Sequence, residues 1–328
     1  MGHGKLKKFA ENLTFRCLLQ PEASSVLAKP EGSRELVLRD HAVKGRWNQD
    51  MFEKPQPIIV ELGCGKGDYT IALARRHPEM NFIGVDIKGA RLWKGAKEAT
   101  EQAMGNVAFL RTRIEFIEAF FGPSEVSEIW LTFSDPQLRG SENARLTSPL
   151  FLQRYSRFLA PGGIVHLKTD SRFLYEYTMS VIRANGLEVL ASGTDIYHVP
   201  LSIPVPTTPS VPTTPSVPTT PSVPTPPVIP SDTPAVIPSE AKESLPDLPA
   251  VFEVQTFYEK MFLEMGLPIT YLAFRLDRMG LENQEVPDTP GAPAYTTAPF
   301  AYPAVPFAYP TDFDAAYWRE AEGPRRSF

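Results

Sequence analysis

Between residues 57 and 193 the sequence alternates six short apolar runs with segments of helical spacing. The runs lie at 57–62, 81–87, 106–111, 125–135, 162–170 and 187–193. This alternation predicts an α/β fold, in which a mostly parallel sheet is covered by helices on both faces. Because crossovers between parallel strands are right-handed, the carboxyl ends of these strands meet at one edge of the sheet, where such folds bind ligands. Functional residues are therefore expected at the strand ends.

A proline-rich stretch interrupts this pattern after residue 198. The hexad VPTTPS repeats from residue 205, and sixteen of the 34 prolines lie between 199 and 250. Proline cannot donate a ladder hydrogen bond, so we predict a disordered segment there. Beyond it, 251–266 predicts a strand entry followed by a short helix, and 269–276 predicts a seventh strand. The tail over 280–328 is rich in proline, alanine and aromatic residues, and we expect it to be disordered or loosely docked.

Charge and cysteine content restrict the partners. Residues 1–198 hold 26 Lys and Arg against 23 Asp and Glu, whereas the rest of the chain holds 7 against 15. A mild basic excess on the foldable part permits a polyanionic partner without requiring one. Cys17, Cys64 and five scattered histidines offer neither a disulfide framework nor metal-ligand spacing. No apolar run approaches a membrane span, so we expect a cytoplasmic protein with no membrane or metal partner.

The first apolar run ends in a glycine loop, Glu61-Leu-Gly63-Cys-Gly65-Lys-Gly67. Glycines allow a tight turn and let backbone N–H groups approach a ligand closely. Asp86 ends the second run, 21 residues after Gly65, and an acidic residue at this place accepts ribose hydroxyls in nucleotide-binding folds. A plain glycine turn and an exposed strand-end carboxylate are the simpler interpretations. The joint register of Glu61 and Asp86 favours a ligand site.

Carboxylates also end the fourth and fifth runs. Asp135, in TFSDPQ, precedes a proline that stiffens the turn, and Asp170, in HLKTDS, follows Lys168. The simpler interpretations are a turn-capping Asp135 and a helix N-cap within 169–171. A capping carboxylate can also bind a ligand, so the two interpretations compete only in part.

Seven short motifs, taken in order, resemble those of bacterial tRNA (guanine-N7-)-methyltransferases. They are KLKKFAEN, VELGCGKGDYT, FIGVDIKGARLWKGAKEA, LTFSDPQ, RLTS, HLKTDS and TFYEK. The resemblance covers residues 5–198 and 252–276, and TFYE downstream of HLKTD is its most selective feature. It implies a Rossmann-like class I methyltransferase with a seven-stranded sheet and an antiparallel last strand. It further implies S-adenosyl-L-methionine as the cofactor and tRNA as the partner.

The resemblance also assigns roles by position. Asp135 matches the catalytic carboxylate at the junction of cofactor and guanine. The cofactor-binding positions are Glu61, Gly63, Gly65, Asp86, Arg113 and Asp135. The substrate-binding positions are Arg139, Asp170, Thr256, Tyr258 and Glu259.

Three features depart from the family pattern. Arg113 stands where relatives carry an acidic residue near adenine, which leaves open what contacts that ring. Ser134 replaces a proline and loosens its turn. The run QLRGSENAR, expected to be rich in Lys and Arg, keeps only Arg139 and Arg145. We therefore expect a weaker grip on RNA there, offset by the basic residues within 5–16 unless these form only a solvated arm.

Guanine N7 carries a lone pair and no proton, so direct in-line methyl transfer needs positioning and no general base. Carboxylates such as Asp135 and Glu259 would recognise the guanine edge or stabilise the moving positive charge. The leading hypothesis is methylation of N7 of a variable-loop guanosine in tRNA. One alternative is a class I methyltransferase for another RNA or a small molecule. A second is a scaffold that displays the PTTP repeats to a partner.

The domain prediction follows from the two halves of the implied site. HLKTD precedes the proline repeat, whereas TFYE and the seventh strand follow it. We therefore predict one methyltransferase domain made of 56–198 and 251–279, with a basic arm and lead-in helices over 1–55. The segment 199–250 is then a surface loop within that domain, since closing a long loop costs little more than closing a short one. The sequence leaves the choice between monomer and homodimer open.

Overall fold

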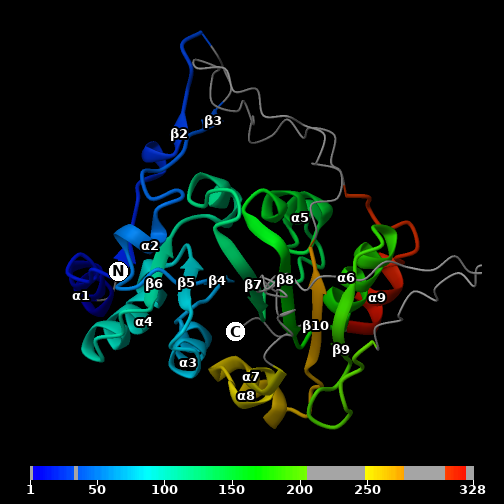
Figure 1. The fold of residues 1–328 in the computed structure, drawn as a ribbon. Coiled ribbons are helices and arrows are strands. Elements are labelled where there is room, and N and C mark those ends of the chain that lie inside the picture. The colour runs from blue at the N-terminus through cyan, green and yellow to red at the C-terminus, as the bar shows by residue number, and fades with distance from the viewer. Residues whose placement is uncertain (1–2, 33–35, 205–247, 277–306, 323–328) are drawn as a thin grey trace, which may run out of the picture.

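The computed structural model describes residues 3–32, 36–204, 248–276 and 307–322. An eight-stranded sheet crosses the molecule in the order β1-β6-β5-β4-β7-β8-β10-β9 (Figure 1). Its strands are β1 (Leu18–Leu19), β4 (Ile58–Leu62), β5 (Asn81–Asp86), β6 (Val107–Arg111), β7 (Val126–Thr132), β8 (Leu159–Thr169), β9 (Val189–Gly193) and β10 (Thr270–Arg275). Neighbouring strands run parallel, except that β10 is antiparallel to both β8 and β9.

The seven predicted strands are present as β4 to β10, and the antiparallel last strand is confirmed. The predicted strand number is wrong by one, because β1 joins the edge of the sheet. In this pairing Leu18 lies opposite Phe109 and Leu19 opposite Leu110. A two-residue strand has no periodicity of its own, so only its contact with β6 defines it.

Both faces of the sheet are buried under helices. Successive side chains of a strand point to opposite faces. In β4, Ile59 therefore packs with the residues of α3 (Asp68–Arg76) and α4 (Gly89–Glu101). Val60 packs in the other layer, with α5 (Pro149–Ser156) and α6 (Arg172–Ala184). Burial on both faces explains why the strands appear in the sequence as nearly continuous apolar runs.

Serine side chains begin the two helices of the second layer. Ser148 precedes α5 and accepts a hydrogen bond from the Phe151 N–H at 3.5 Å. Ser171 precedes α6 and accepts one from the Leu174 N–H at 3.1 Å. These caps satisfy N–H groups that the first helical turn leaves without a partner. The predicted N-cap within 169–171 is therefore Ser171.

The N-terminal arm packs against helix α4. Helix α1 (His3–Asn12) lies beside α4 (Figure 1). The Asn12 side-chain amide donates to the Gly89 carbonyl at 2.9 Å, and the Trp93 indole N–H donates to Glu11 at 2.6 Å. The other short elements before β4 are α2 (Trp47–Asp50), the pair β2 (Leu27–Ala28) and β3 (Val37–Leu38), and a 3-10 turn, Ala23–Ser25.

The chain leaves the sheet after β9 and returns to the same sheet with residues 248–276. Helices α7 (Leu248–Glu253) and α8 (Phe257–Glu264) lead into β10, which lies between β8 and β9. The strand entry predicted at residue 251 is wrong, because this stretch belongs to α7. The ammonium group of Lys168 binds the carbonyls of Val251 and Val254, a tertiary contact that the local pattern does not contain. Residues 205–247, most of the predicted disordered segment, lie outside the described residues.

A folded segment of the tail packs against α6. Residues 307–322 end in α9 (Ala315–Glu322), which lies beside α6 (Figure 1). Phe307 is 3 % exposed. Asn185 and Ala308 exchange two hydrogen bonds, at 2.9 and 2.6 Å. The expectation of a disordered or loosely docked tail does not hold for this segment, while 277–306 and 323–328 lie outside the described residues.

Candidate active site

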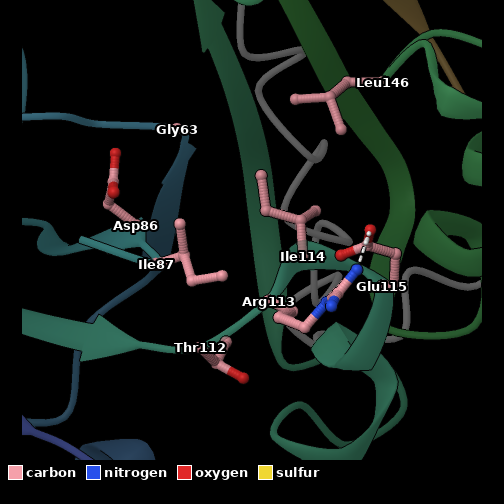
Figure 2. A pocket seen from close by; sticks show the side chains of 8 residues that line it. All are labelled: Gly63, Asp86, Ile87, Thr112, Arg113, Ile114, Glu115 and Leu146. Carbon is pink, nitrogen blue, oxygen red and sulfur yellow. Dashed lines mark hydrogen bonds and ion pairs between the residues drawn. The ribbon is translucent and has the colours of Figure 1, made fainter. Parts of the chain in front are cut away.

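A pocket of about 340 Å³ lies at the carboxyl ends of β4, β5 and β6 (Figure 2). Its lining residues are Gly63, Asp86, Ile87, Thr112, Arg113, Ile114, Glu115 and Leu146. This volume is typical of small-molecule and cofactor sites. The pocket lies at the edge of the sheet formed by the carboxyl ends of the strands, where open α/β folds bind ligands.

The glycine loop borders this pocket with exposed backbone. Gly63 has a φ of +82° and Gly65 a φ of +59°, a backbone region that side-chain-bearing residues rarely adopt. No atom lies within 4 Å of the position that a Cβ would take at either glycine. The intervening Cys64 is buried, and burial raises the pKa of its thiol well above the usual value, with further contributions from Glu61 and Asp86. The loop therefore offers backbone groups to a ligand, while its neutral thiol packs inward.

Asp86 holds the glycine loop and faces the pocket. One carboxylate oxygen accepts a hydrogen bond from the Gly65 N–H at 3.0 Å. The other accepts from the Lys88 N–H at 2.6 Å. A carboxylate oxygen can accept two hydrogen bonds, so each retains capacity for a hydroxyl group. These free lone pairs are suited to accept the paired hydroxyls of a ribose.

Glu61 lies beside the loop but does not line the pocket. It is 4 % exposed and accepts hydrogen bonds from the Thr70 N–H at 2.9 Å and from the hydroxyls of Thr70 and Thr132. Burial raises the pKa of Glu61, and these hydrogen bonds oppose that shift. The carboxylate thus ties β4 to α3 and β7, which positions the loop between them.

Arg113 lies at the pocket with an acidic neighbour. Its guanidinium pairs with Glu115 at 3.2 Å, and Figure 2 shows this pair across the pocket from Asp86 and Ile87. Both residues flank the start of the 3-10 helix Ile114–Ala119. A carboxylate is therefore present at this wall, two residues after the position where the family pattern has one. The glutamate of LRTRIE is the sequence signal for this carboxylate.

The loop after β7 carries Asp135 in a strained backbone. Phe133 has a φ of +51° and Gln137 a φ of +52°, which are rare for residues other than glycine. The exposed Asp135 accepts a hydrogen bond from the Gln137 N–H at 2.9 Å, so it does cap its own turn. The hydroxyl of Ser134 is buried with no hydrogen-bond partner among the described residues. Strain of this kind is concentrated at functional sites.

Glu259 forms a buried ion pair with Lys168. Both side chains are fully buried, and the Lys168 ammonium lies 2.7 Å from a Glu259 carboxylate oxygen. Tyr197 donates a hydrogen bond to the same oxygen at 2.7 Å. The second oxygen of Glu259 has no hydrogen-bond partner within the described part of the chain. Burial lowers the pKa of Lys168, and the neighbouring Glu259 opposes that shift.

Helix α8 brings the other predicted substrate residues to the same edge of the sheet. Thr256 caps α8 by accepting a hydrogen bond from the Glu259 N–H at 3.2 Å, and Tyr258 is half-buried in the first turn. The Lys66 ammonium of the glycine loop lies 4.9 Å from the ring of Phe257. The rings of Phe133 and Phe262 lie 5.9 Å apart, which joins α8 to the loop after β7. Asp170 is half-buried immediately after β8.

The two arginines in the run after Pro136 differ in exposure. Arg139 is exposed, on the stretch after Asp135. Arg145 is 4 % exposed and donates hydrogen bonds to the carbonyls of Pro136 at 3.2 Å and Gln137 at 3.4 Å. The guanidinium of Arg145 is therefore committed to the protein backbone, which leaves Arg139 as the exposed basic residue of this run.

The structure thus gathers the predicted residues in two groups. Gly63, Asp86 and Arg113 line the pocket, with Gly65 bonded to Asp86. Glu259 and Thr256 lie on α8, near the strand ends of β7 and β8. Sequence reasoning missed Tyr197, which no motif marks, and the binding role of Lys168.

The described residues contain neither a metal-binding cluster nor a membrane-spanning helix. No group of three or more His, Cys, Asp or Glu side chains within them is arranged to hold a metal ion. None of the helices in the described ranges is both long and apolar enough to cross a membrane.

Comparison with known proteins places the chain in a family. A family model described as "Putative methyltransferase" matches residues 55–208. The chain is 40% identical over 273 residues to the tRNA (guanine-N(7)-)-methyltransferase of Christiangramia forsetii, covering 83% of this chain and 97% of that protein. The same enzyme of Bacteroides thetaiotaomicron is 39% identical over 281 residues, covering 86% and 89%, and that of Bacteroides fragilis 38% over 280, covering 85% and 88%. At this identity and coverage, the chain belongs to the tRNA (guanine-N(7)-)-methyltransferase family.

Proposed function

We propose that this protein transfers the methyl group of S-adenosyl-L-methionine to N7 of a variable-loop guanosine in tRNA. The observation that carries the proposal is the meeting of two features at one edge of the sheet. One is the pocket formed by the glycine loop and Asp86, and the other is the α8 segment that begins at Thr256. The names of the relatives support the same substrate and position.

The pocket residues have separate tasks in binding the cofactor. The free lone pairs of Asp86 accept ribose hydroxyls, and the open backbone at Gly63 and Gly65 lies against the amino-acid half. The apolar side chains of Ile87, Ile114 and Leu146 are suited to the face of the adenine ring. Glu61 acts indirectly, because it fixes the strands and the helix that flank the loop. When bound, S-adenosyl-L-methionine supplies a methyl group on a positively charged sulfur.

The chain's task in the reaction is positioning and charge stabilisation. Guanine N7 has a lone pair and loses no proton, so in-line transfer proceeds without a general base. We assign Asp135 to the junction between cofactor and base, where its carboxylate stabilises positive charge as the charge moves from sulfur to guanine. Leu146 lines the pocket and the adjacent Arg145 holds the loop that carries Asp135, which supports this assignment.

The remaining predicted residues are assigned to the tRNA. Glu259 is assigned to the N1–H or N2–H edge of guanine from its position in the TFYE motif. Its side chain is fully buried in this structure, so its unpartnered oxygen accepts that hydrogen bond only once α8 moves to open the site. Thr256 and Tyr258 precede Glu259 at the start of α8. Asp170 directly follows β8, the strand that contains Lys168. Arg139 is the exposed cation of the loop and is assigned to a phosphate.

We also propose that residues 56–198 and 251–279 form one domain, with 199–250 as an excursion from it. The antiparallel pairing of β10 with both β8 and β9 supports this division, because one sheet contains segments from both sides of 205–247. The tail segment 307–322 is added to this domain through α6.

Nucleoside analysis tests the function. The protein is incubated with unmodified tRNA and with S-adenosyl-L-methionine labelled in its methyl group, and the tRNA is then digested. Label in 7-methylguanosine is expected, and it should disappear when the variable-loop guanosine of a transcript is replaced by adenosine. Label in another nucleoside, or in ribosomal RNA but in no tRNA, would instead support a methyltransferase for another RNA. The small number of basic residues after Pro136 favours that alternative.

A further inference from the structure

The buried Arg145 connects the loop of Asp135 to helix α6. Its Nε atom donates to the Pro136 carbonyl at 3.2 Å, and an Nη atom donates to the Gln137 carbonyl at 3.4 Å. Its guanidinium lies 4.9 Å from the ring of Phe173 and 4.6 Å from the ring of Tyr177. These rings are four residues apart and therefore lie on one face of α6. The guanidinium of Arg145 thus connects the loop after β7 to helix α6.

The tail segment 307–322 contacts the same two rings. Phe313 meets Phe173 at 5.2 Å and 85°, and meets Tyr177 at 5.3 Å and 78°. Both angles are edge-to-face arrangements, which aromatic pairs favour. Glu322 also accepts a hydrogen bond from the Phe173 N–H at 2.9 Å, and Asp312 pairs with Arg183 at 3.1 Å. The tail therefore fixes the aromatic pair against which Arg145 stacks.

The loop held by Arg145 is one that local structure alone does not favour. Phe133 and Gln137 both have positive φ without being glycine, and such residues persist only where surrounding contacts hold them. The carbonyl of Gln137 is one of the two that Arg145 binds, and the Gln137 N–H binds Asp135. A change at Arg145 therefore reaches Asp135 through a single residue.

We propose that Arg145, braced by the tail segment 307–322 through Phe173 and Tyr177, is a positioning residue that fixes the loop of Asp135 for methyl transfer. This proposal rests on the function proposed above. Arg145 is 4 % exposed and its guanidinium is bound to two carbonyls of the loop, so it acts on the reaction only through the loop. Its effect is on the conformation in which Asp135 is presented, and the tail segment becomes part of the catalytic apparatus through its contacts with α6.

Steady-state kinetics with tRNA and S-adenosyl-L-methionine provide the first test. Arg145→Met keeps the length of the side chain but removes its donors, and kcat is expected to fall about 10- to 100-fold, the range that a misplaced catalytic group costs. The KM for S-adenosyl-L-methionine should change little, because Asp86 and the glycine loop are untouched. Arg145→Lys should recover only part of kcat, since an ammonium lacks the planar fork that reaches both carbonyls and stacks on the rings.

A double-mutant cycle tests the link to the tail. Phe313→Ala should lower kcat several-fold, with Tyr317→Ala as the control because Tyr317 lies on the same segment, is 61% exposed and is clear of both rings. In the Arg145→Met background, Phe313→Ala should have almost no further effect, since both act on one loop. Independent, multiplying effects of the two substitutions would overturn the proposal, as would an Arg145→Met enzyme that retains its kcat.

Hydrogen exchange of the amides in 133–140, measured without tRNA, separates this proposal from the proposed function. Faster exchange is expected in Arg145→Met and Phe313→Ala but not in Tyr317→Ala. If the wild type transfers no methyl group to tRNA while this exchange pattern holds, the function is wrong and the bracing of the loop stands. If exchange is unchanged in both variants, the bracing is wrong. Should Arg145→Met fail to fold, Arg145→Lys and Phe313→Ala carry both measurements.

Discussion

Replacing Lys168 with methionine should lower the free energy of unfolding by about 3–5 kcal/mol. The substitution removes the cation from a pair in which both side chains are fully buried. It leaves Glu259 as a buried, uncompensated charge and leaves the carbonyls of Val251 and Val254 without the donor that holds them. A loss of this size is a large fraction of the 5–15 kcal/mol by which typical domains are stable.

Urea unfolding at neutral pH, followed by circular dichroism, measures this loss. Lys94→Met is the matched control, because Lys94 is 51% exposed and pairs with Asp68 at the surface. Exposed pairs contribute about 0–1 kcal/mol, so the control should scarcely shift the midpoint. The double variant Lys168→Met with Glu259→Gln should recover part of the loss, because it removes the buried charge along with its partner. A cost below about 1 kcal/mol for Lys168→Met, or a double variant no more stable than the single one, would refute the reasoning.

Three substitutions and one segment replacement test other parts of the molecule. Asp86→Ala should raise the KM for S-adenosyl-L-methionine more than it lowers kcat, as steady-state kinetics would show. Asp135→Ala should abolish methyl transfer while leaving the urea midpoint unchanged, since this carboxylate is exposed. Burial raises the pKa of Glu61 in the folded protein above its ordinary value of 4.5. The wild type therefore loses stability as the pH rises from 4.5 through this raised pKa. Glu61→Gln lacks this loss, and its free energy of unfolding relative to the wild type should therefore increase over that window. Replacing 205–247 by a Gly/Ser connector of a quarter of its length should preserve folding and activity and add about 1 kcal/mol of stability.

Each of these has a contrary outcome. A normal cofactor KM in Asp86→Ala would remove Asp86 from the ribose site. Retention of most activity in Asp135→Ala would mean that the catalytic assignment is wrong. A pH-independent difference for Glu61→Gln would mean that this carboxyl has its ordinary pKa in the folded protein. An unfolded connector variant would show that 205–247 is structural.

The sheet was largely predictable because its information is local. Strands buried on both faces appear as apolar runs, and the glycine loop and strand-end carboxylates mark one edge. The failures are places where a distant contact decides. β1 exists through its pairing with β6, and α7 forms where a pattern suggested a strand, with the carbonyl of its Val251 bound by Lys168. In the tail, Phe307 and Phe313 pack against α6 within a sequence that has no periodicity.

The site was predicted less completely, for the same reason. Asp86 lies where its spacing from the glycine loop indicated. The burial of Arg145 could not be predicted, because a basic residue in a polar run gives no sign of it. The pairing of Lys168 with Glu259 joins positions 91 residues apart in the chain, on either side of the proline repeat. Such a pair becomes visible only once the sheet is assembled.

The most direct test of N7 methylation uses a tRNA whose variable-loop guanosine is replaced by 7-deazaguanosine, which pairs and stacks like guanosine but lacks the N7 atom. Methyl transfer from labelled S-adenosyl-L-methionine is measured for this tRNA and for the matched guanosine transcript. We expect label in 7-methylguanosine for the guanosine transcript and none for the 7-deaza transcript. Equal labelling of the two transcripts would contradict the account, because the methyl group would then be on another atom or another nucleotide.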